Sequence, residues 1–342
     1  MSNNEKQDEK ELWQRIPNTE GTDRAETFVA LSHIAYDRGD HKACLALCES
    51  AREIYEQLGA ETSTAALMHV YEGITWSLRK LDRDEEAAEV ALHAVDILKE
   101  NNPMQAADMM RDAGRFYFAA EKYEKSLQCH KNAIAEIDPD TTDFTMGIDS
   151  YNCGFALIRM EKYAESLEYM FAARNYLKKA KEPEKVYYCD EYLAVAYIAL
   201  NNGVEATTHA QKCLDFAQTA QDDCLEAWAR YRLGCAKVLL GEIDEAEDLL
   251  RKSLRITVNA CSPDWELAID LEKEIANILV IKGRVAEANE ILRRISTIEE
   301  TMNVPLILEM SKPSIRAGGA AKPSSRPSSR RSDSGCTATG SV

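Results

Sequence analysis

The chain has 342 residues, of which 45% are hydrophobic, with only 15 glycines and 9 prolines. An all-β protein needs many turns, so this shortage of turn residues argues against one, while the hydrophobic fraction is ample for a core. No apolar run approaches the roughly 18–20 residues that a membrane-spanning helix needs, so we expect no membrane association.

The charge is spread unevenly along the chain. Residues 311–342 contain six Lys or Arg and one Asp, a net +5, which leaves 35 basic and 57 acidic residues before them, a net −22. Because such an acidic body repels phosphates, we expect it not to bind nucleic acid.

The two ends of the sequence lack the periodicity of a folded domain. We expect residues 1–23, which are polar and acidic, to form a flexible arm that holds at most a short helix around Glu9–Arg15. The arm has no apolar segment of the kind found in a secretory signal, so we expect a cytoplasmic protein. Residues 311–342 are rich in Ser, Pro, Arg and Gly, which predicts a disordered tail.

Three roles for the tail stay open. Ser325, Ser329 and Ser332 lie close to basic residues, a context that basophilic kinases accept, and phosphates there would cancel the positive charge. The tail could instead be a solvated linker, or it could fold across the acidic body.

Apolar residues recur at helical spacing from Ala25 onward, and this pattern itself repeats. A small residue in the second helix of each copy marks the repeat, at Cys44, Ala87, Ser126, Ser166, Ala206, Ala246 and Ala288. The steps between them are 43, 39, 40, 40, 40 and 42 residues. Antiparallel helices approach closely only where side chains are small, so we interpret these positions as helix crossings. One hairpin cannot bury both of its faces, and the pattern therefore predicts stacked hairpins.

Local signals are expected to shape the copies and to end the stack. The turn between the two helices is predicted at four glycines, namely Gly39, Gly203, Gly241 and Gly283. After Met302 the pattern stops, and the apolar residues 304–310 are predicted to cap the last helix.

This pattern resembles the tetratricopeptide repeat, in which Leu-Gly and Tyr lie in the first helix and Ala, Phe and Ala in the second, with Pro after it. The matching residues are Phe28, Leu31, Gly39 and Ala51 in the first copy, Ala113-Gly114, Tyr117, Tyr123, Ser126, Ala133 and Pro139 in the third, and Leu233-Gly234, Gly241 and Ala246 in the sixth. The usual unit has about 34 residues, so these longer copies are similar to those of kinesin light chains and bacterial peptide-sensing regulators. The resemblance implies an all-α, right-handed α-solenoid of about seven hairpins over residues 24–310.

Motifs of known chemistry are missing from the sequence. It has no GxxxxGK followed by Ser or Thr, no GxGxxG, no HExxH and no GxSxG, so we expect a protein that is not an enzyme and needs no cofactor. The ten cysteines include no CxxC pair, which predicts reduced thiols packed in the core. His41, Cys44 and Cys48 could reach one zinc ion, but both cysteines occupy packing positions, and we expect no metal site.

In the family that the pattern resembles, the first helix of each copy lines the inside of the superhelix. Carried onto this sequence, the inward positions of copies two to six gather arginine, aromatic residues and asparagine. They are Trp76, Arg79, Arg111, Arg115, Phe118, Tyr151, Asn152, Phe155, Arg159, Tyr188, Tyr192, Trp228, Tyr231 and Arg232. Arginine and aromatic residues are typical of binding hot spots, and asparagine can hold a peptide backbone. Alternatively, the aromatic rings pack between neighbouring helices and meet no ligand.

We therefore expect a scaffold or adaptor that binds an extended peptide or a partner helix in the concave groove. Among the inward arginines, Arg111, Arg115, Arg159 and Arg232 would suit an acidic ligand. The alternative is a peptide-sensing regulator whose superhelix changes shape on binding, although an arm of 23 residues is too short for the effector module that such regulators carry. Self-association through an end repeat stays open.

Overall fold

The computed structural model describes residues 3–59, 63–100, 102–135, 141–260 and 264–301. These residues form fifteen α-helices and one short 3-10 helix, and no strand occurs among them. The chain divides into two compact units, residues 1–183 and 184–342. The predicted cap at 304–310 and the predicted tail at 311–342 lie outside the described residues.

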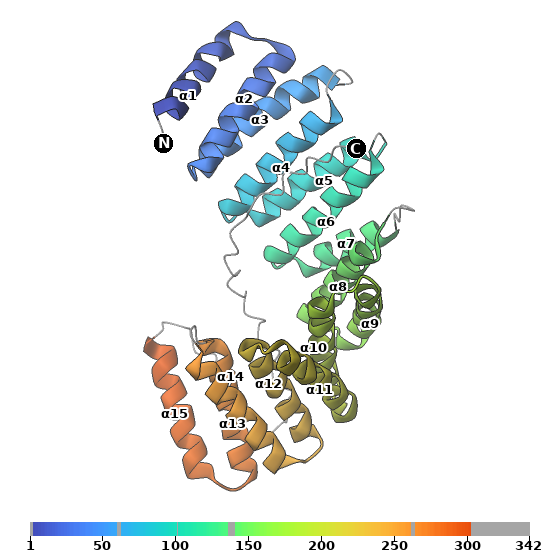
Figure 1. The fold of residues 1–342 in the computed structure, drawn as a ribbon, viewed down its shortest axis with the longest axis vertical. Helices are drawn as coiled ribbons and strands as arrows, with labels where there is room; N and C mark the ends of the chain where they lie inside the picture. Colours follow the sequence, from blue (N-terminus) through green and yellow to red (C-terminus); the bar gives the residue numbers. More distant parts are fainter. Residues whose placement is uncertain (1–2, 60–62, 101, 136–140, 261–263, 302–342) are drawn as a thin grey trace. The chain divides into compact units, whose positions relative to one another are not determined.

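Four helical hairpins follow one another in the first unit (Figure 1). They pair α2 (Gly21–Asp37) with α3 (His41–Leu58), α4 (Thr64–Lys80) with α5 (Asp84–Leu98), α6 (Pro103–Ala119) with α7 (Tyr123–Ala135), and α8 (Asp143–Arg159) with α9 (Tyr163–Lys179). From α2 onward each helix packs against the next in chain order, which is the arrangement of a stack of hairpins.

The second unit contains three more hairpins. They pair α10 (Pro183–Ala199) with α11 (Gly203–Ala220), α12 (Asp223–Leu239) with α13 (Ile243–Asn259), and α14 (Trp265–Ile281) with α15 (Val285–Thr301). From α11 onward each helix again packs against the next, and α12 also touches α14. The all-α fold of seven hairpins that the sequence predicts is confirmed, and the right-handed winding stays a prediction.

The start of the chain differs from the expected flexible arm. Helix α1 (Asn3–Arg15) and the 3-10 helix η1 (Ile16–Asn18) occupy much of residues 1–23. Two apolar side chains explain the difference, because Leu12 and Ile16 pack against the first core. Glu9 also accepts a hydrogen bond of 2.5 Å from Arg38 at the end of α2. The helix is therefore longer than the short segment expected around Glu9–Arg15.

The small residues that mark the repeat lie at buried helix crossings. All seven, from Cys44 to Ala288, are at most 3% exposed. A glycine makes the same close approach from the first helix of the fourth hairpin, where a Cβ atom on Gly154 would lie 3.0 Å from the Cγ atom of Met170 and 3.3 Å from its backbone nitrogen. The predicted crossings are thus confirmed.

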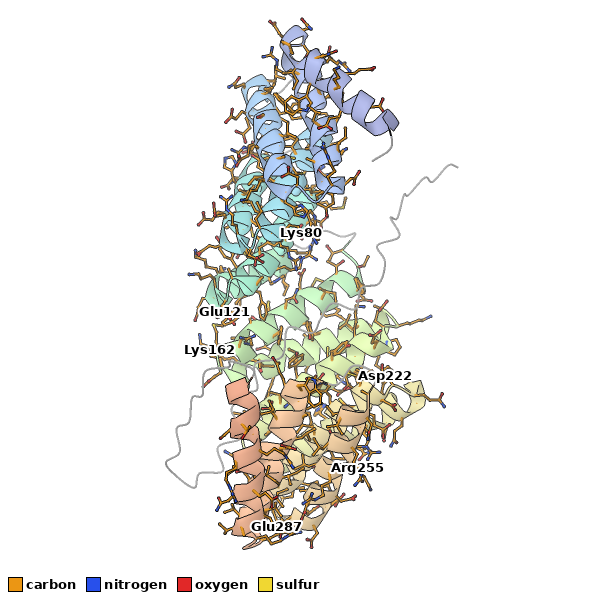
Figure 2. The ribbon with its side chains drawn as sticks, turned by 90° about the vertical axis from the view of Figure 1, so that its left-hand side faces the viewer. Lys80, Glu121, Lys162, Asp222, Arg255 and Glu287 are labelled. Carbon is orange, nitrogen blue, oxygen red and sulfur yellow. The ribbon has the colours of Figure 1, made fainter. Side chains whose placement is uncertain are left out.

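One residue with a positive φ closes the turn of each hairpin. These residues are Gly39, Asp82, Glu121, Glu161, Asn201, Gly241 and Gly283, of which Glu121 is labelled in Figure 2. Gly203 is not among them, so its prediction as a turn residue is wrong. It starts α11, where a Cβ atom would lie 2.9 Å from the Cδ2 atom of Leu240, so a larger residue there would displace that side chain.

Short polar side chains begin several helices by accepting a hydrogen bond from the backbone of the first turn. These caps are Asp40, Asn102, Thr142, Asn202, Asp222 and Asp264. Each satisfies a backbone donor that a helix start leaves unpaired, which fixes where the hairpin begins.

Most of the described cysteines pack inside the stack, as predicted. Cys44, Cys48, Cys129, Cys153, Cys189 and Cys213 are buried free thiols, whereas Cys235 is half-buried and Cys224 is exposed. Among the helices that the structure describes, none combines the length and the apolar character needed to cross a membrane.

Candidate functional site

Four of the predicted inward residues meet across α6 and α8. The rings of Phe118 and Phe155 stack with centroids 4.7 Å apart, and the ring of Tyr151 lies 5.9 Å from that of Phe155. The guanidinium of Arg159 lies 4.8 Å from the ring centre of Tyr123 and 6.0 Å from that of Phe118. All five side chains are half-buried. We call these five residues the aromatic cluster.

Helical spacing produces the aromatic cluster. Tyr151, Phe155 and Arg159 follow at intervals of four residues, so they share one face of α8. Phe118 comes from the same face of the preceding first helix, and Tyr123 begins the second helix of that hairpin. The sequence analysis used Tyr123 only to align the repeats, and its position three residues before the marker Ser126 was the available signal.

A second pair of predicted residues lies on α4. Trp76 is 44% exposed, and the guanidinium of Arg79 lies 5.5 Å from its ring centre. On the next first helix, surrounding protein and then the positive charge of Arg79 lower the pKa of Arg115, so the two guanidinium groups are close enough to repel. Arg115 also forms an ion pair with Asp112 on its own helix.

Arg111 is bound within the protein. Its guanidinium donates to Asp149 over 2.7 Å and to Asp108 over 2.8 Å. Burial lowers the pKa of Arg111, but the hydrogen bonds to these two carboxylates outweigh it, and the pKa is raised. Asp149 is 0% exposed and also lies 3.2 Å from the Nδ1 atom of His130. Arg111 therefore links α6 to α8 through an ion pair, and its hydrogen-bond donors already bind carboxylates of the protein.

The sequence analysis missed Asp149. Its position carried a signal, because Asp149 lies one helical turn before the buried Cys153 and hence on the core side of α8. A carboxylate on a core face needs a cationic or hydrogen-bonding partner, which the neighbouring copies supply here.

Two of the four predicted aromatic residues of the second unit are packed inside it. Trp228 and Tyr231 are only 6% and 5% exposed. The guanidinium of Arg232 lies 5.1 Å and 4.9 Å from their ring centres, and its Nε atom has no hydrogen-bond partner among the described residues. For these two rings the structure agrees with the alternative that they fill space between helices.

The remaining predicted residues are half-buried. Tyr188 meets the buried Tyr187 edge to face with ring centres 5.3 Å apart. Tyr192 lies one turn further along α10, and Asn152 lies on α8 beside the aromatic cluster residue Tyr151.

Acidic groups of the second unit were also missed. Glu191 on α10 is 4% exposed, and its negative charge helps to raise the pKa of Arg232. On α14, burial raises the pKa of both Asp270 and Glu274, which lie one turn apart. The sequence analysis assigned inward positions only in copies two to six, whereas α14 belongs to the seventh copy. The first helices of the second unit therefore offer carboxyl groups as well as Arg232.

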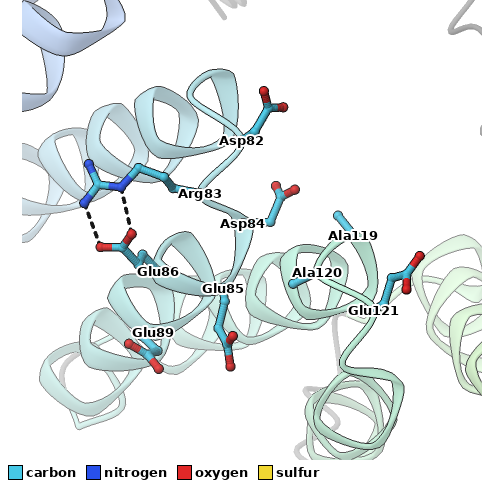
Figure 3. A pocket seen from close by; sticks show the side chains of 9 residues that line it. All are labelled: Asp82, Arg83, Asp84, Glu85, Glu86, Glu89, Ala119, Ala120 and Glu121. Atoms are coloured by element: carbon cyan, nitrogen blue, oxygen red, sulfur yellow. Dashed lines mark hydrogen bonds and ion pairs between the residues drawn. The ribbon is translucent and has the colours of Figure 1, made fainter.

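An acidic hollow of about 700 Å³ lies at the turns of the second and third hairpins (Figure 3). Six carboxylate residues line it, namely Asp82, Asp84, Glu85, Glu86, Glu89 and Glu121. Arg83 makes two hydrogen bonds of 2.7 Å to Glu86, and Glu85 is paired with Lys122 and Lys125. Cations of the protein thus already neutralise part of this surface.

Comparison with known proteins agrees with the geometry of the hairpins. The model of the tetratricopeptide repeat matches residues 227–264, which contain most of α12 and all of α13. Residues 227–264 thus carry a tetratricopeptide repeat. No curated protein sequence matches the chain.

Several solved structures of tetratricopeptide-repeat proteins superpose on the chain. A signal-transduction ATPase with numerous domains from Pyrococcus horikoshii, which has a tetratricopeptide-repeat sensor, gives a TM-score of 0.59 at 19% identity over 72% of this chain and 38% of that one. The apo form of RapI gives 0.57 at 13% identity over 81% and 77% of the two chains. NprR in complex with its cognate peptide NprX gives 0.50 at 14% identity over 79% and 77%. At these identities the likeness shows a shared fold, and the chain spans little more than a third of the archaeal protein.

The different roles of two arginines can be measured. Arg111→Ala leaves the buried Asp149 without its closest cation, so we expect the free energy of unfolding to fall by about 3 kcal/mol. Arg159→Ala removes only a contact with half-buried rings and should cost less than about 1 kcal/mol. Urea unfolding followed by circular dichroism measures both. Equal losses in the two variants would contradict the assignment.

The raised pKa of Asp270 makes a second prediction about stability. Ionisation of this buried carboxyl opposes folding, so its cost is absent in acid and grows as the pH rises through the raised pKa. Asp270→Asn should therefore unfold at a higher temperature than the unchanged protein near pH 7 but not near pH 3.

Glu247 in the same unit is the matched control. Its hydrogen bond from Lys282 lowers its pKa, so Glu247→Gln should unfold at a lower temperature near pH 7, the opposite sign. Thermal unfolding across the pH range gives both results. A loss of stability at neutral pH in Asp270→Asn would refute the assigned cost of burial.

Proposed function

We propose that the chain is a non-enzymatic binding protein that holds an acidic peptide, or an acidic segment of a partner protein, against the first helices of its first unit. The observation that carries the proposal concerns the contacts of two arginines, Arg79 and Arg159. Neither forms an ion pair with any residue in the described part of the chain, yet each lies over an aromatic ring. Two arginines of an acidic body thus lack an ion pair within the described residues, although the positive charge of Arg79 acts on the nearby Asp84.

The chemistry of these groups suits a carboxylate ligand. A guanidinium held against a ring face still presents its N–H donors at its edge, and it can bind a carboxylate through two parallel hydrogen bonds. An anion between Arg79 and Arg115 would also relieve the repulsion that lowers the pKa of Arg115. The half-buried rings of Phe118, Tyr151 and Phe155 offer apolar contact beside these charges.

Structures of similar fold support a peptide as the ligand class. A Rap protein has been solved with the competence and sporulation factor, and NprR with its cognate peptide NprX. A peptide-sensing regulator is accordingly the second candidate for this chain, in which binding would change the arrangement of the hairpins. The cytoplasmic location expected from the sequence stays a prediction.

Binding of short fluorescein-labelled peptides tests the proposal. We expect peptides of Glu and Leu to raise fluorescence polarisation on binding, and peptides of Lys and Leu to have no such effect. The double variant Arg79→Glu/Arg159→Glu should weaken binding of the acidic peptides by about tenfold or more, because two attractive charges become repulsive.

Arg255→Glu/Arg293→Glu provides the matched control. It makes the same change of charge at exposed positions of α13 and α15, which are second helices of the other unit; Arg255 is labelled in Figure 2. Its affinity should stay within about twofold of that of the unchanged chain. Equal weakening in both variants would indicate only the long-range effect of net charge, and tight binding by Arg79→Glu/Arg159→Glu would contradict the proposed surface.

A change in small-angle scattering on saturation with peptide would favour the regulator over the scaffold.

A further inference from the structure

Two histidines from neighbouring first helices touch each other in the first unit. The Nε2 atom of His33 on α2 lies 2.6 Å from the Nε2 atom of His69 on α4. Their ring centres are 4.9 Å apart and the rings meet edge to face at 84°. Both residues are exposed. The pair is separate from the aromatic cluster and takes no part in the binding surface proposed above.

The contact between the two Nε2 atoms leaves room for only one proton between them. A single proton can be shared between the two nitrogens, whereas two would place N–H groups head to head. Burial and then the neighbouring His69 lower the pKa of His33, and the carboxylate of Asp37 one turn away counters them in part. A metal ion needs the lone pair of an imidazole nitrogen, and a pair that shares one proton presents such a lone pair at the contact.

The geometry is close to that of two nitrogen ligands on one metal ion. Two imidazole nitrogens, each ~2.0–2.1 Å from a tetrahedral Zn²⁺, lie about 3.3 Å from each other. The two Nε2 atoms therefore need to separate by less than about 1 Å, and small rotations of exposed side chains supply such a shift. A metal ion would replace the shared proton and keep both rings in place.

We propose that His33 and His69 form a two-histidine site for a divalent transition-metal ion, which joins α2 to α4 and leaves its remaining coordination positions to water. Within the described residues no group of three or more His, Cys, Asp or Glu side chains is arranged to hold a metal, so this is an open site of two protein ligands. Imidazole ligands suit Zn²⁺, Ni²⁺ and Cu²⁺, whereas Mg²⁺ and Ca²⁺ prefer oxygen.

Calorimetric titration of the full chain with NiCl2 tests the site. Thiolates prefer softer ions, so Ni²⁺ reports on imidazoles in a chain that also has cysteines. After treatment with a chelator and its removal, we expect one saturable site per chain. His33→Ala and His69→Ala should each weaken its affinity by about tenfold or more, because each leaves a single ligand.

Two control variants distinguish binding of Ni²⁺ at this pair from binding at other side chains. His93→Ala removes a half-exposed histidine of α5 that has no second histidine beside it, and Cys224→Ser removes the exposed thiol. Both should bind Ni²⁺ like the unchanged chain. Ni²⁺ should also raise the unfolding temperature of the unchanged chain and not that of His33→Ala, since an ion that bridges two helices favours the folded state. No saturable site, or a site that survives in both His33→Ala and His69→Ala, would overturn the proposal.

Discussion

The whole stack depends on how closely two helices approach where a small residue stands between them. At the seven marker positions the side chain is no larger than that of cysteine, and the helix packed against it fills the remaining space. Glycine makes the approach closer still at Gly154, which has Met170 against its Cα atom. These crossings set the distance between the two helices of a hairpin, as the contact of Gly154 on α8 with Met170 on α9 shows.

The binding surface and the internal ion pairs both follow from that stacking. First helices of neighbouring copies bring Phe118 beside Phe155 and also Arg111 beside Asp149. The first contact leaves rings half-exposed, whereas the second satisfies a buried carboxylate and removes an arginine from the set available to a ligand. Arg111 and Arg159 thus have opposite roles, because the following copy presents a carboxylate to Arg111, whereas the preceding copy presents aromatic rings to Arg159.

The repeat could be predicted from the sequence because its signal is periodic and recurs seven times. Single side-chain contacts could not, since they depend on which residue of the next copy lies opposite. The role of Arg111 was missed for this reason, and the sequence left open whether Trp228 and Tyr231 meet a ligand or pack between helices. Gly203 shows the same limit, because a glycine can serve a turn or a close approach, and only the structure shows that Asn201 takes the positive φ while Gly203 starts α11. The helix at the start of the chain was underestimated because only Leu12 and Ile16 attach it to the core.

The free energy of unfolding of the Gly154→Val variant tests the close approach most directly. Its added methyl groups would meet Met170, whose backbone nitrogen cannot move aside, so we expect a loss of about 1–3 kcal/mol. Ala286→Val at an exposed position of α15 measures the effect of a branched residue in a helix without a crossing. A loss confined to the Gly154 variant would support the account. A Gly154→Val protein as stable as the Ala286 variant would show that the helices are not held at this distance.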